Sequence, residues 1–165
     1  MSTEKVREYL KQFGKQDAVQ EFDVSSATVE LAAQALGVEP ARIAKTISLM
    51  GKEGCVLIVA AGDGKIDGSR FKKTFGLKAK MLNPEETEEL TGYRVGGICP
   101  FANPEGAKVY LDESLRRFQT IFPACGTSNS AVEMTCEELE QCARSQGWVD
   151  VCKGWREDST ERCES

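Results

Sequence analysis

The spacing of apolar residues along the chain predicts an alternation of helices and strands. Helical periodicity, with capping residues and glycine stops, predicts five helices, over residues 3–13, 25–36, 67–75, 83–92 and 135–144. Alternating or continuous apolar runs predict eight strands, over residues 18–24, 43–50, 55–62, 78–82, 108–115, 119–123, 131–135 and 147–151. Several strands are joined by links of hairpin length. The pattern therefore favours a mixed α/β layer or a distorted barrel over a purely parallel sheet.

Local signals mark where the helices begin. The second helix is expected to start at an N-cap formed by Ser25 or Ser26. The residues of that helix expected to face inward are Val29, Leu31, Ala32, Ala35 and Leu36. Asp67 and Asn83 are expected to cap the next two helices, and Thr135 begins a capping box for the last.

One residue of the strand over 43–50 does not fit its surroundings. Side chains alternate between the two faces of a strand, so Lys45 shares a face with Ile43, Ile47 and Leu49. Such a lysine can pack its stem along apolar neighbours and leave its ammonium group at the strand end. Alternatively, it lies at the floor of a pocket and holds a phosphate or carbonyl oxygen or orients a water, with its pKa lowered by burial. Lys45 is therefore a candidate functional residue.

Length and composition are typical of one globular domain. The chain has 165 residues, of which 41% are hydrophobic and 28% charged. No repeat, low-complexity segment or linker is visible, so we expect one domain over residues 1–155 and a polar, frayed tail over 156–165. No apolar run approaches the ~20 residues that span a bilayer, and the charged N-terminus lacks a signal-peptide pattern. A cytoplasmic location without a membrane partner is expected.

The composition excludes several kinds of catalytic site. The chain contains no histidine, which rules out Ser-His-Asp and Cys-His pairs and a histidine general base. The seven cysteines, none in a CxxC pair, are expected to be reduced core thiols plus an exposed one in the tail; they are Cys55, Cys99, Cys125, Cys136, Cys142, Cys152 and Cys163. A zinc site would need cysteines at unusual spacing, so no metal and no cofactor is expected. Any enzyme here must use lysine, carboxylates, hydroxyls, backbone amides or groups of its substrate.

Positive charge is concentrated in one segment. The net charge is −5, yet residues 65–80 carry six Lys or Arg and one Asp, a local charge of +5. These cations either form a solvated helix face or contact phosphates. In the second case the expected phosphate contacts are Lys65, Arg70, Lys72 and Lys73.

Two loops rich in small residues could hold a ligand. In GGICPFANP, residues 96–104, the paired glycines let backbone amides approach a ligand, but the loop matches neither a P-loop nor a dinucleotide fingerprint. In CGTSNS, residues 125–130, hydroxyl and amide groups could bind a polar ligand. Each loop by itself is equally compatible with a simple connection or turn. Without histidine, an activated-serine mechanism has little support.

Three segments occur in an informative order: SSATVELAAQALGVEPARIAKTISL, then VGGICPF, then CGTSNSAVEMT. Together they resemble the YbaK/prolyl-tRNA-synthetase-associated editing domain family, which includes free-standing ProX-type proteins. The resemblance runs from about Phe22 to about Leu139. It implies an α/β fold with a mixed-strand, barrel-like sheet flanked by helices. It also implies hydrolysis of the ester that links a wrong amino acid to a tRNA, commonly a tRNA for proline, with a prolyl-tRNA synthetase as a further partner.

The resemblance also implies roles for individual residues. Water is the nucleophile, helped by the free hydroxyl of the terminal ribose, and amides of the GGxxP loop lie near the ester carbonyl, where they can stabilise an oxyanion. The implied catalytic residues are Lys45, Gly96 and Gly97. The implied substrate contacts are Phe22, Thr28, Thr46, Ile98, Pro100, Gly126, Thr127, Ser128, Asn129 and Ser130. This chemistry needs neither histidine nor metal.

Some questions stay open at the level of sequence. Some relatives carry an acid where this chain has Ala131, with Glu133 the nearest acid, and the difference bears on the amino acid accepted. Alanine, cysteine, serine and threonine are all handled within the family, and one methylene is worth only ~1–3 kcal/mol of discrimination. The same pocket could also serve a non-catalytic module that binds aminoacyl-tRNA or a synthetase. A cysteine-dependent enzyme built on Cys99 or Cys125 is a third reading.

Overall fold

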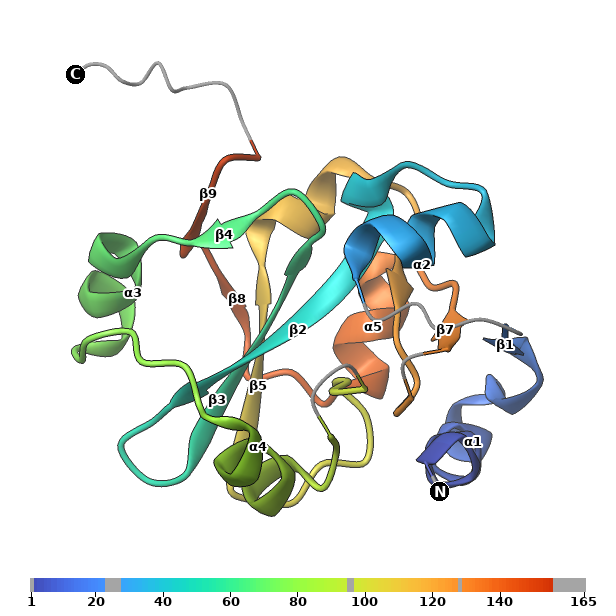
Figure 1. Cartoon of the computed structure of the whole chain (residues 1–165), viewed down its shortest axis with the longest axis horizontal. Helices are drawn as coiled ribbons and strands as arrows, with labels where there is room; N and C mark the ends of the chain where they lie inside the picture. The colour runs from blue at the N-terminus through green and yellow to red at the C-terminus, as the bar shows by residue number, and fades with distance from the viewer. Residues whose placement is uncertain (1, 23–27, 95–96, 128, 156–165) are drawn as a thin grey trace.

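A mixed five-stranded sheet organises the molecule. The computed structural model describes residues 2–22, 28–94, 97–127 and 129–155. Within these ranges the sheet has the order β6-β2-β3-β5-β8 (Figure 1). The strands are β2 (Ile43–Met50), β3 (Cys55–Ala61), β5 (Ala107–Asp112), β6 (Phe122–Pro123) and β8 (Trp148–Val149). β2 and β3 are antiparallel, whereas β6, β5 and β8 each pair in parallel with a neighbour, which confirms the predicted mixed α/β fold.

Two short antiparallel ribbons extend the architecture. One pairs β1 (Val19–Glu21) with β7 (Ser130–Val132), and the other pairs β4 (Lys65–Ile66) with β9 (Cys152–Lys153). The predicted strand over 78–82 is reduced to an isolated bridge between Leu49 and Met81. The β4–β9 ribbon was not predicted, because two-residue strands carry no periodic signal of their own.

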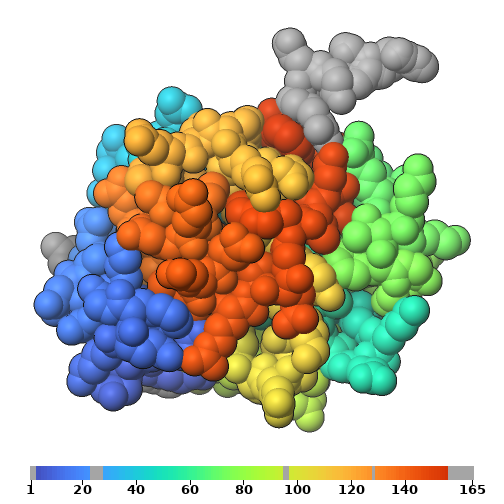
Figure 2. All heavy atoms as spheres, turned by 180° about the vertical axis from the view of Figure 1, so that it is seen from behind, coloured from blue at the N-terminus to red at the C-terminus, as the bar shows by residue number. Residues whose placement is uncertain are grey.

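Helices flank the sheet on both faces. They are α1 (Ser2–Leu10), α2 (Val29–Leu36), α3 (Gly68–Phe75), α4 (Pro84–Thr91) and α5 (Cys136–Cys142), with short 3-10 helices η1 (Lys11–Phe13), η2 (Gln16–Ala18), η3 (Pro40–Arg42) and η4 (Glu113–Arg117). Asp67 and Asn83 cap α3 and α4, and Thr135 forms the capping box of α5, all as predicted. The space-filling view from behind shows the N-terminal segment lying beside the segment that contains α5 (Figure 2).

The start of α2 corrects one prediction. The observed N-cap is Thr28, whose hydroxyl accepts a hydrogen bond from the Leu31 amide at 3.1 Å. Ser25 and Ser26 lie outside the described residues. With Thr28 as its cap, α2 has eight residues, about two turns. Such a short helix buries a narrow stripe, formed by Ala32 and Ala33, and leaves Leu31 44% exposed. Ala35 is exposed as well, so the predicted inward face was too wide.

The core lies on both faces of the sheet. All seven residues of β3 are buried, as expected for a central strand. Leu57 and Val59 belong to one apolar cluster, which includes residues of α1 and α5, whereas Ile58 and Ala60 belong to a second cluster beneath α3. Each fully buried large side chain contributes about 1.5–3 kcal/mol to stability.

The alternation predicted for β2 is present. Ala44 and Met50 pack with the first cluster and Ile47 and Leu49 with the second. Lys45 pairs across the ladder with Ala60, which is a member of the second cluster. Lys45 therefore occupies a position on the α3 side of the sheet.

A buried carboxylate joins the ends of several strands. Asp112 is fully buried and accepts hydrogen bonds from the amides of Ser114 and Val151, both at 2.9 Å. The Ser114 hydroxyl in turn accepts a hydrogen bond from the Ala61 amide at 3.0 Å. The ends of β3 and β5 and the segment that leads into β9 are thus held at one point.

The turn after β3 passes very close to the segment between α2 and β2. A Cβ atom built on Gly62 would lie 2.0 Å from the Pro40 carbonyl oxygen and 2.7 Å from the Val29 side chain. Only a residue without a side chain fits there. Gly62 thus sets how closely α2 approaches the sheet.

We expect Gly62→Ala to lower the free energy of unfolding by about 1–3 kcal/mol, because backbone atoms must move to admit the methyl group. Gly68→Ala is the matched control, since a Cβ at Gly68 has no atom within 4 Å. Urea denaturation of both variants and the wild type measures the effect. Equal midpoints for the two variants would contradict the packing seen at Gly62.

Candidate functional site

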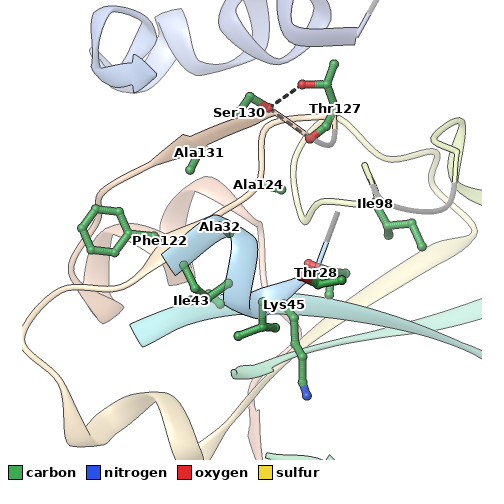
Figure 3. Close-up of a pocket in the computed structure, with 13 residues that line it drawn as sticks. Thr28, Ala32, Ile43, Lys45, Ile98, Phe122, Ala124, Thr127, Ser130 and Ala131 are labelled. Atoms are coloured by element: carbon green, nitrogen blue, oxygen red, sulfur yellow. Dashed lines mark hydrogen bonds between the residues drawn. The ribbon is translucent and has the colours of Figure 1, made fainter. Parts of the chain in front are cut away.

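A cavity of about 230 Å³ lies where α2, β2 and the β6–β7 region meet (Figure 3). Its walls come from segments far apart in the sequence, namely Thr28, Val29, Ala32, Ile43, Ala44, Lys45, Thr46, Ile98, Phe122, Ala124, Thr127, Ser130 and Ala131. Six residues predicted to act at the site are brought together here: Thr28, Lys45, Thr46, Ile98, Thr127 and Ser130. The cavity is therefore the candidate substrate site.

Lys45 lies between the cavity and the turn after β3. The residue lines the cavity, and its ammonium group donates a hydrogen bond to the Gly62 carbonyl at 3.3 Å. The close-up shows this ammonium pointing away from Thr127 and Ser130 (Figure 3). Burial lowers the pKa of Lys45, and the nearby Cys152 and Asp63 partly oppose that shift. Both sequence-based readings of Lys45 therefore describe part of its environment.

Thr46 carries an unpaired polar group at the cavity. Its hydroxyl oxygen is buried and has no hydrogen-bond partner within the described part of the chain. A buried hydroxyl without a partner costs about 1–3 kcal/mol. A polar group of a ligand could satisfy it, so Thr46 is suited to contact a substrate.

The two glycine-containing loops touch through their backbones. A Cβ built on Gly97 would lie 2.6 Å from the Gly126 carbonyl oxygen, so no side chain fits between the loops. Gly126 has φ +95°, a conformation that favours glycine. The Gly97 amide donates to the Arg94 carbonyl at 2.9 Å and is thus engaged within its own loop. Gly96 lies outside the described residues.

Hydroxyl groups order the second loop. Thr127 donates a hydrogen bond from its hydroxyl to that of Ser130 at 2.8 Å, and the Cys125 amide donates to the same Ser130 oxygen at 3.2 Å. Ser130 donates in turn to the Thr127 carbonyl at 3.3 Å. The Ser130 hydroxyl is therefore part of a turn that shapes the cavity wall. Ser128 lies outside the described residues.

Some predicted substrate contacts do not line the cavity. Asn129 donates from its side chain to the Phe22 carbonyl at 3.0 Å, and the Phe22 amide donates to the Asn129 carbonyl at 2.8 Å. This pair joins the end of β1 to the loop before β7, and neither residue is among the lining residues. Gly126 supports the loop contact described above, and Pro100 lines a different cavity.

The apolar walls were not recognised from the sequence. Ala32, Ile43, Phe122 and Ala124 line the cavity, yet in the sequence they read only as parts of a helix and strands. Ala131 also lines it, and the acid that some relatives carry at this position was the one available signal.

The acid nearest to the second loop is occupied elsewhere. Glu133 lies 3.6 Å from the Arg42 guanidinium and accepts a hydrogen bond from the Thr120 hydroxyl at 2.7 Å. It is not among the residues that line the cavity. Glu133 therefore does not replace the acid that some relatives place at the position of Ala131.

The predicted phosphate contacts lie on β4 and α3, at the opposite end of the molecule from β1 and β7 (Figure 1). Lys65, Lys72 and Lys73 are exposed, and Lys153 pairs with Lys65 across the β4–β9 ribbon. Arg70 instead forms ion pairs with Asp67 at 3.7 Å and Asp150 at 3.2 Å. The lysines, rather than Arg70, are thus the available cations of this surface.

The cysteines are placed unfavourably for catalysis. The six cysteines in the described part of the chain are free, and Cys99 and Cys125 are fully buried. Burial raises the pKa of Cys99 to about 11 and raises that of Cys125 well above its usual value, so neither forms a thiolate readily. This disfavours the cysteine-dependent reading. No group of three or more potential metal ligands occurs within the described ranges.

Comparison with known proteins decides the family. A family model described as "Aminoacyl-tRNA editing domain" matches residues 23–142. The chain belongs to this family. It is therefore an aminoacyl-tRNA deacylase, a hydrolase that edits mischarged tRNA.

Relatives of this editing domain include proteins of similar length and parts of larger enzymes. YwhH of Bacillus subtilis, an uncharacterized protein, is 51% identical over 156 residues, which cover 94% of this chain and 99% of YwhH. EbsC of Enterococcus faecalis, provisionally named a Cys-tRNA(Pro)/Cys-tRNA(Cys) deacylase, is 30% identical over 72% of this chain and 74% of its own. A proline–tRNA ligase of Aquifex aeolicus is 33% identical over 53% of this chain but only 16% of the ligase.

Solved structures share the fold of this editing domain. A crystal structure described as a provisional trans-editing enzyme for prolyl-tRNA synthetase has a TM-score of 0.83 and 29% identity, and the match covers 92% of this chain and 97% of that one. The protein APE2540 has a TM-score of 0.80 and 28% identity over 90% of this chain and 99% of its own. Among the described residues, none of the helices has the length and apolar character needed to cross a membrane.

We expect Thr46→Val to raise the free energy of unfolding by about 1 kcal/mol while lowering kcat/KM for deacylation, because it removes a buried, unpaired hydroxyl from the lining of the candidate site. Thr87→Val is the control, since the Thr87 hydroxyl lies 3.3 Å from that of Ser48 and its loss leaves a partner unpaired. Urea denaturation and single-turnover deacylation measure both effects. A loss of stability in Thr46→Val as large as in Thr87→Val would contradict the assignment.

Proposed function

We propose that this editing domain acts in trans on a tRNA for proline that carries a small non-cognate amino acid, and that the cavity beside β2 holds the aminoacyl-adenosine end. The observation that carries the proposal is the convergence of Lys45, Thr46, Thr127 and Ser130 on one cavity in a chain of this family. The name given to EbsC and the description of the trans-editing structure support the same class of substrate.

The dimensions and lining of the cavity support a small side chain. Its volume of about 230 Å³ must hold the amino acid together with part of the terminal ribose. Alanines 32, 124 and 131 and the larger Ile43 and Phe122 form an apolar wall. A substrate side chain that lies against this apolar part of the wall, rather than beside the Thr46 hydroxyl, is favoured when it is alanine or cysteine, because a serine or threonine hydroxyl would be buried there without a partner. Discrimination by one methylene amounts to about 1–3 kcal/mol, so the preference is graded.

The proposed reaction is attack of a water molecule on the ester carbonyl. A tetrahedral intermediate carries negative charge on the former carbonyl oxygen, and cleavage of the C–O bond releases the amino acid and a free ribose hydroxyl on the tRNA. The proton lost by the water passes to the departing ribose oxygen. No side chain with a pKa near neutrality is needed, which agrees with the absence of histidine.

Lys45 is proposed to stabilise the developing charge. In the structure the ammonium donates a hydrogen bond to the Gly62 carbonyl. To reach the ester, the Lys45 side chain must change rotamer so that the ammonium points into the cavity that the residue already lines. Gly97 is proposed to act with the undescribed Gly96 as the backbone side of the oxyanion site. Since the Gly97 amide donates to the Arg94 carbonyl, that role requires this hydrogen bond to break when substrate binds.

The first experiment is a hydrolysis panel of alanyl-, cysteinyl-, seryl-, threonyl- and prolyl-tRNA for proline, measured with wild type and Lys45→Ala. We expect hydrolysis of alanyl- or cysteinyl-tRNA, protection of prolyl-tRNA, and a loss of at least about 100-fold in rate for Lys45→Ala. Lys11→Ala is the control, since the exposed Lys11 lies outside the cavity and forms an ion pair with Glu8 at 3.0 Å.

The alternative function is a module that binds the aminoacyl end without turnover. Survival of every ester while the protein still binds charged tRNA would favour that module and make Lys45 a ligand contact. Hydrolysis of prolyl-tRNA at the same rate as the other esters would contradict the proposed specificity.

We further propose that the exposed lysines of β4 and α3 contact tRNA phosphates. Lys72→Ala is expected to weaken tRNA binding and to reduce the slope of log K against log salt by about 0.7–0.9, the value for one phosphate contact. Lys11→Ala changes the net charge equally and is expected to keep the wild-type slope. Filter binding at several salt concentrations tests this. An unchanged slope in Lys72→Ala would assign tRNA contact to another surface or to a prolyl-tRNA synthetase partner.

A further inference from the structure

A second cavity lies behind the loop that contains Gly97. Its volume is about 400 Å³, and its wall combines residues of α1, of the loop before β5 and of the segment after α5. These three segments meet on the rear face of the molecule (Figure 2). Ile98 lines the substrate cavity and Pro100 lines the second one, so the two cavities adjoin the same short stretch of chain.

Backbone strain is concentrated at this cavity. Within the described part of the chain, the non-glycine residues with a left-handed φ are Ala102, at +56°, and Arg144, at +52°. Both line the second cavity. Strained conformations of this kind are retained where the side chain or the local geometry serves a function.

At Arg144 the left-handed backbone places a charged side chain at the cavity. It directly follows the C-cap of α5, and the Ser145 amide donates to the Glu140 carbonyl at 3.2 Å, an arrangement in which glycine is favoured. The arginine instead holds a guanidinium at the cavity, 2.9 Å from the Gln12 side-chain oxygen and 5.6 Å from the centre of the Tyr9 ring. Arginine, although less favourable than glycine in this backbone conformation, thus supplies a cation held in place by Gln12.

The other lining groups define the ligand. Lys108 adds a second cation, whereas Glu105 is the single acid among the lining residues. Asn103 donates to the Cys99 carbonyl at 2.9 Å, and its side-chain oxygen is buried without a partner among the described residues. The half-buried Tyr9 ring, which packs against Phe13 with ring centroids 5.7 Å apart, adds an aromatic side chain to the wall. A ligand that fits this wall carries negative charge, an N–H donor and a flat ring.

We propose that the second cavity binds a nucleoside phosphate, with the phosphate near Arg144 and Lys108 and the base near Tyr9 and Asn103. Arginine is the cation best suited to bind phosphate through paired hydrogen bonds. The nucleotide is either part of the tRNA substrate, which rests on the proposed function, or a free nucleotide. In both cases the Asn103–Cys99 hydrogen bond connects the ligand to the loop of the substrate site.

The test is titration of the full chain with AMP and with CMP, in which binding is measured by calorimetry or by NMR chemical-shift changes. Binding to the wild type is expected, with at least about a tenfold weaker Kd in Arg144→Gly and an intermediate Kd in Arg144→Lys, because lysine keeps the charge but not the paired hydrogen bonds. Arg144→Gly is expected to fold at least as stably as the wild type, because glycine relieves the left-handed backbone. Lys78→Ala, on an exposed residue outside both cavities, controls for the change in charge.

Deacylation kinetics distinguish the two sources of the nucleotide. If the nucleotide belongs to tRNA, AMP competes with tRNA, and Arg144→Gly raises KM with little change in kcat. If it is free, AMP changes kcat without competing, and Arg144→Gly abolishes that response. Failure of AMP and CMP to bind, or equal binding to wild type and Arg144→Gly, would overturn the proposal. Loss of the proposed function would appear separately, as absence of wild-type deacylation without any added nucleotide.

Discussion

The candidate site depends on a parallel pairing of only two residues from each of two strands. Ile43 and Ala44 of β2 pair with Phe122 and Pro123 of β6, which brings the segment that leads to Ser130 next to the strand that carries Lys45. Short parallel pairs are weak alone, and Arg42 reinforces this one. Its guanidinium bonds to the Thr120 carbonyl at 3.2 Å and lies 5.1 Å from the Phe122 ring centre. Without this junction, the cavity would lose one wall.

The local features of the fold could be predicted from the sequence, and the long-range ones could not. Asp67, Asn83 and Thr135 were identified as caps because a cap and the amides it binds are only two or three residues apart. The start of α2 was misplaced because several hydroxyl residues in succession could each act as a cap. The β4–β9 ribbon joins segments more than 80 residues apart, and the local sequence of neither segment indicates that the two pair.

The site shows the same division. Lys45 stood out because it interrupts an apolar face, and the family resemblance assigned Thr46 and the two small-residue loops. Phe122 and Ala124 were missed because their position on the wall follows from the pairing of β6 with β2. Arg70 was predicted to contact phosphate, yet its pairing with Asp150 arises only when the chain returns beside α3. Residue type therefore identified the chemical groups, and topology decided which of them share a cavity.

The bond between Lys45 and the Gly62 carbonyl has a consequence for substrate affinity. A substrate that recruits the ammonium must compete with this internal acceptor, so the measured affinity is the difference between two bonds to the same donor. Gly62 is also the residue that presses against Pro40 beside α2. The Lys45 ammonium thus rests on the same turn that fixes the cavity wall, and in the proposed mechanism its movement to the ester exchanges a structural contact for a chemical one.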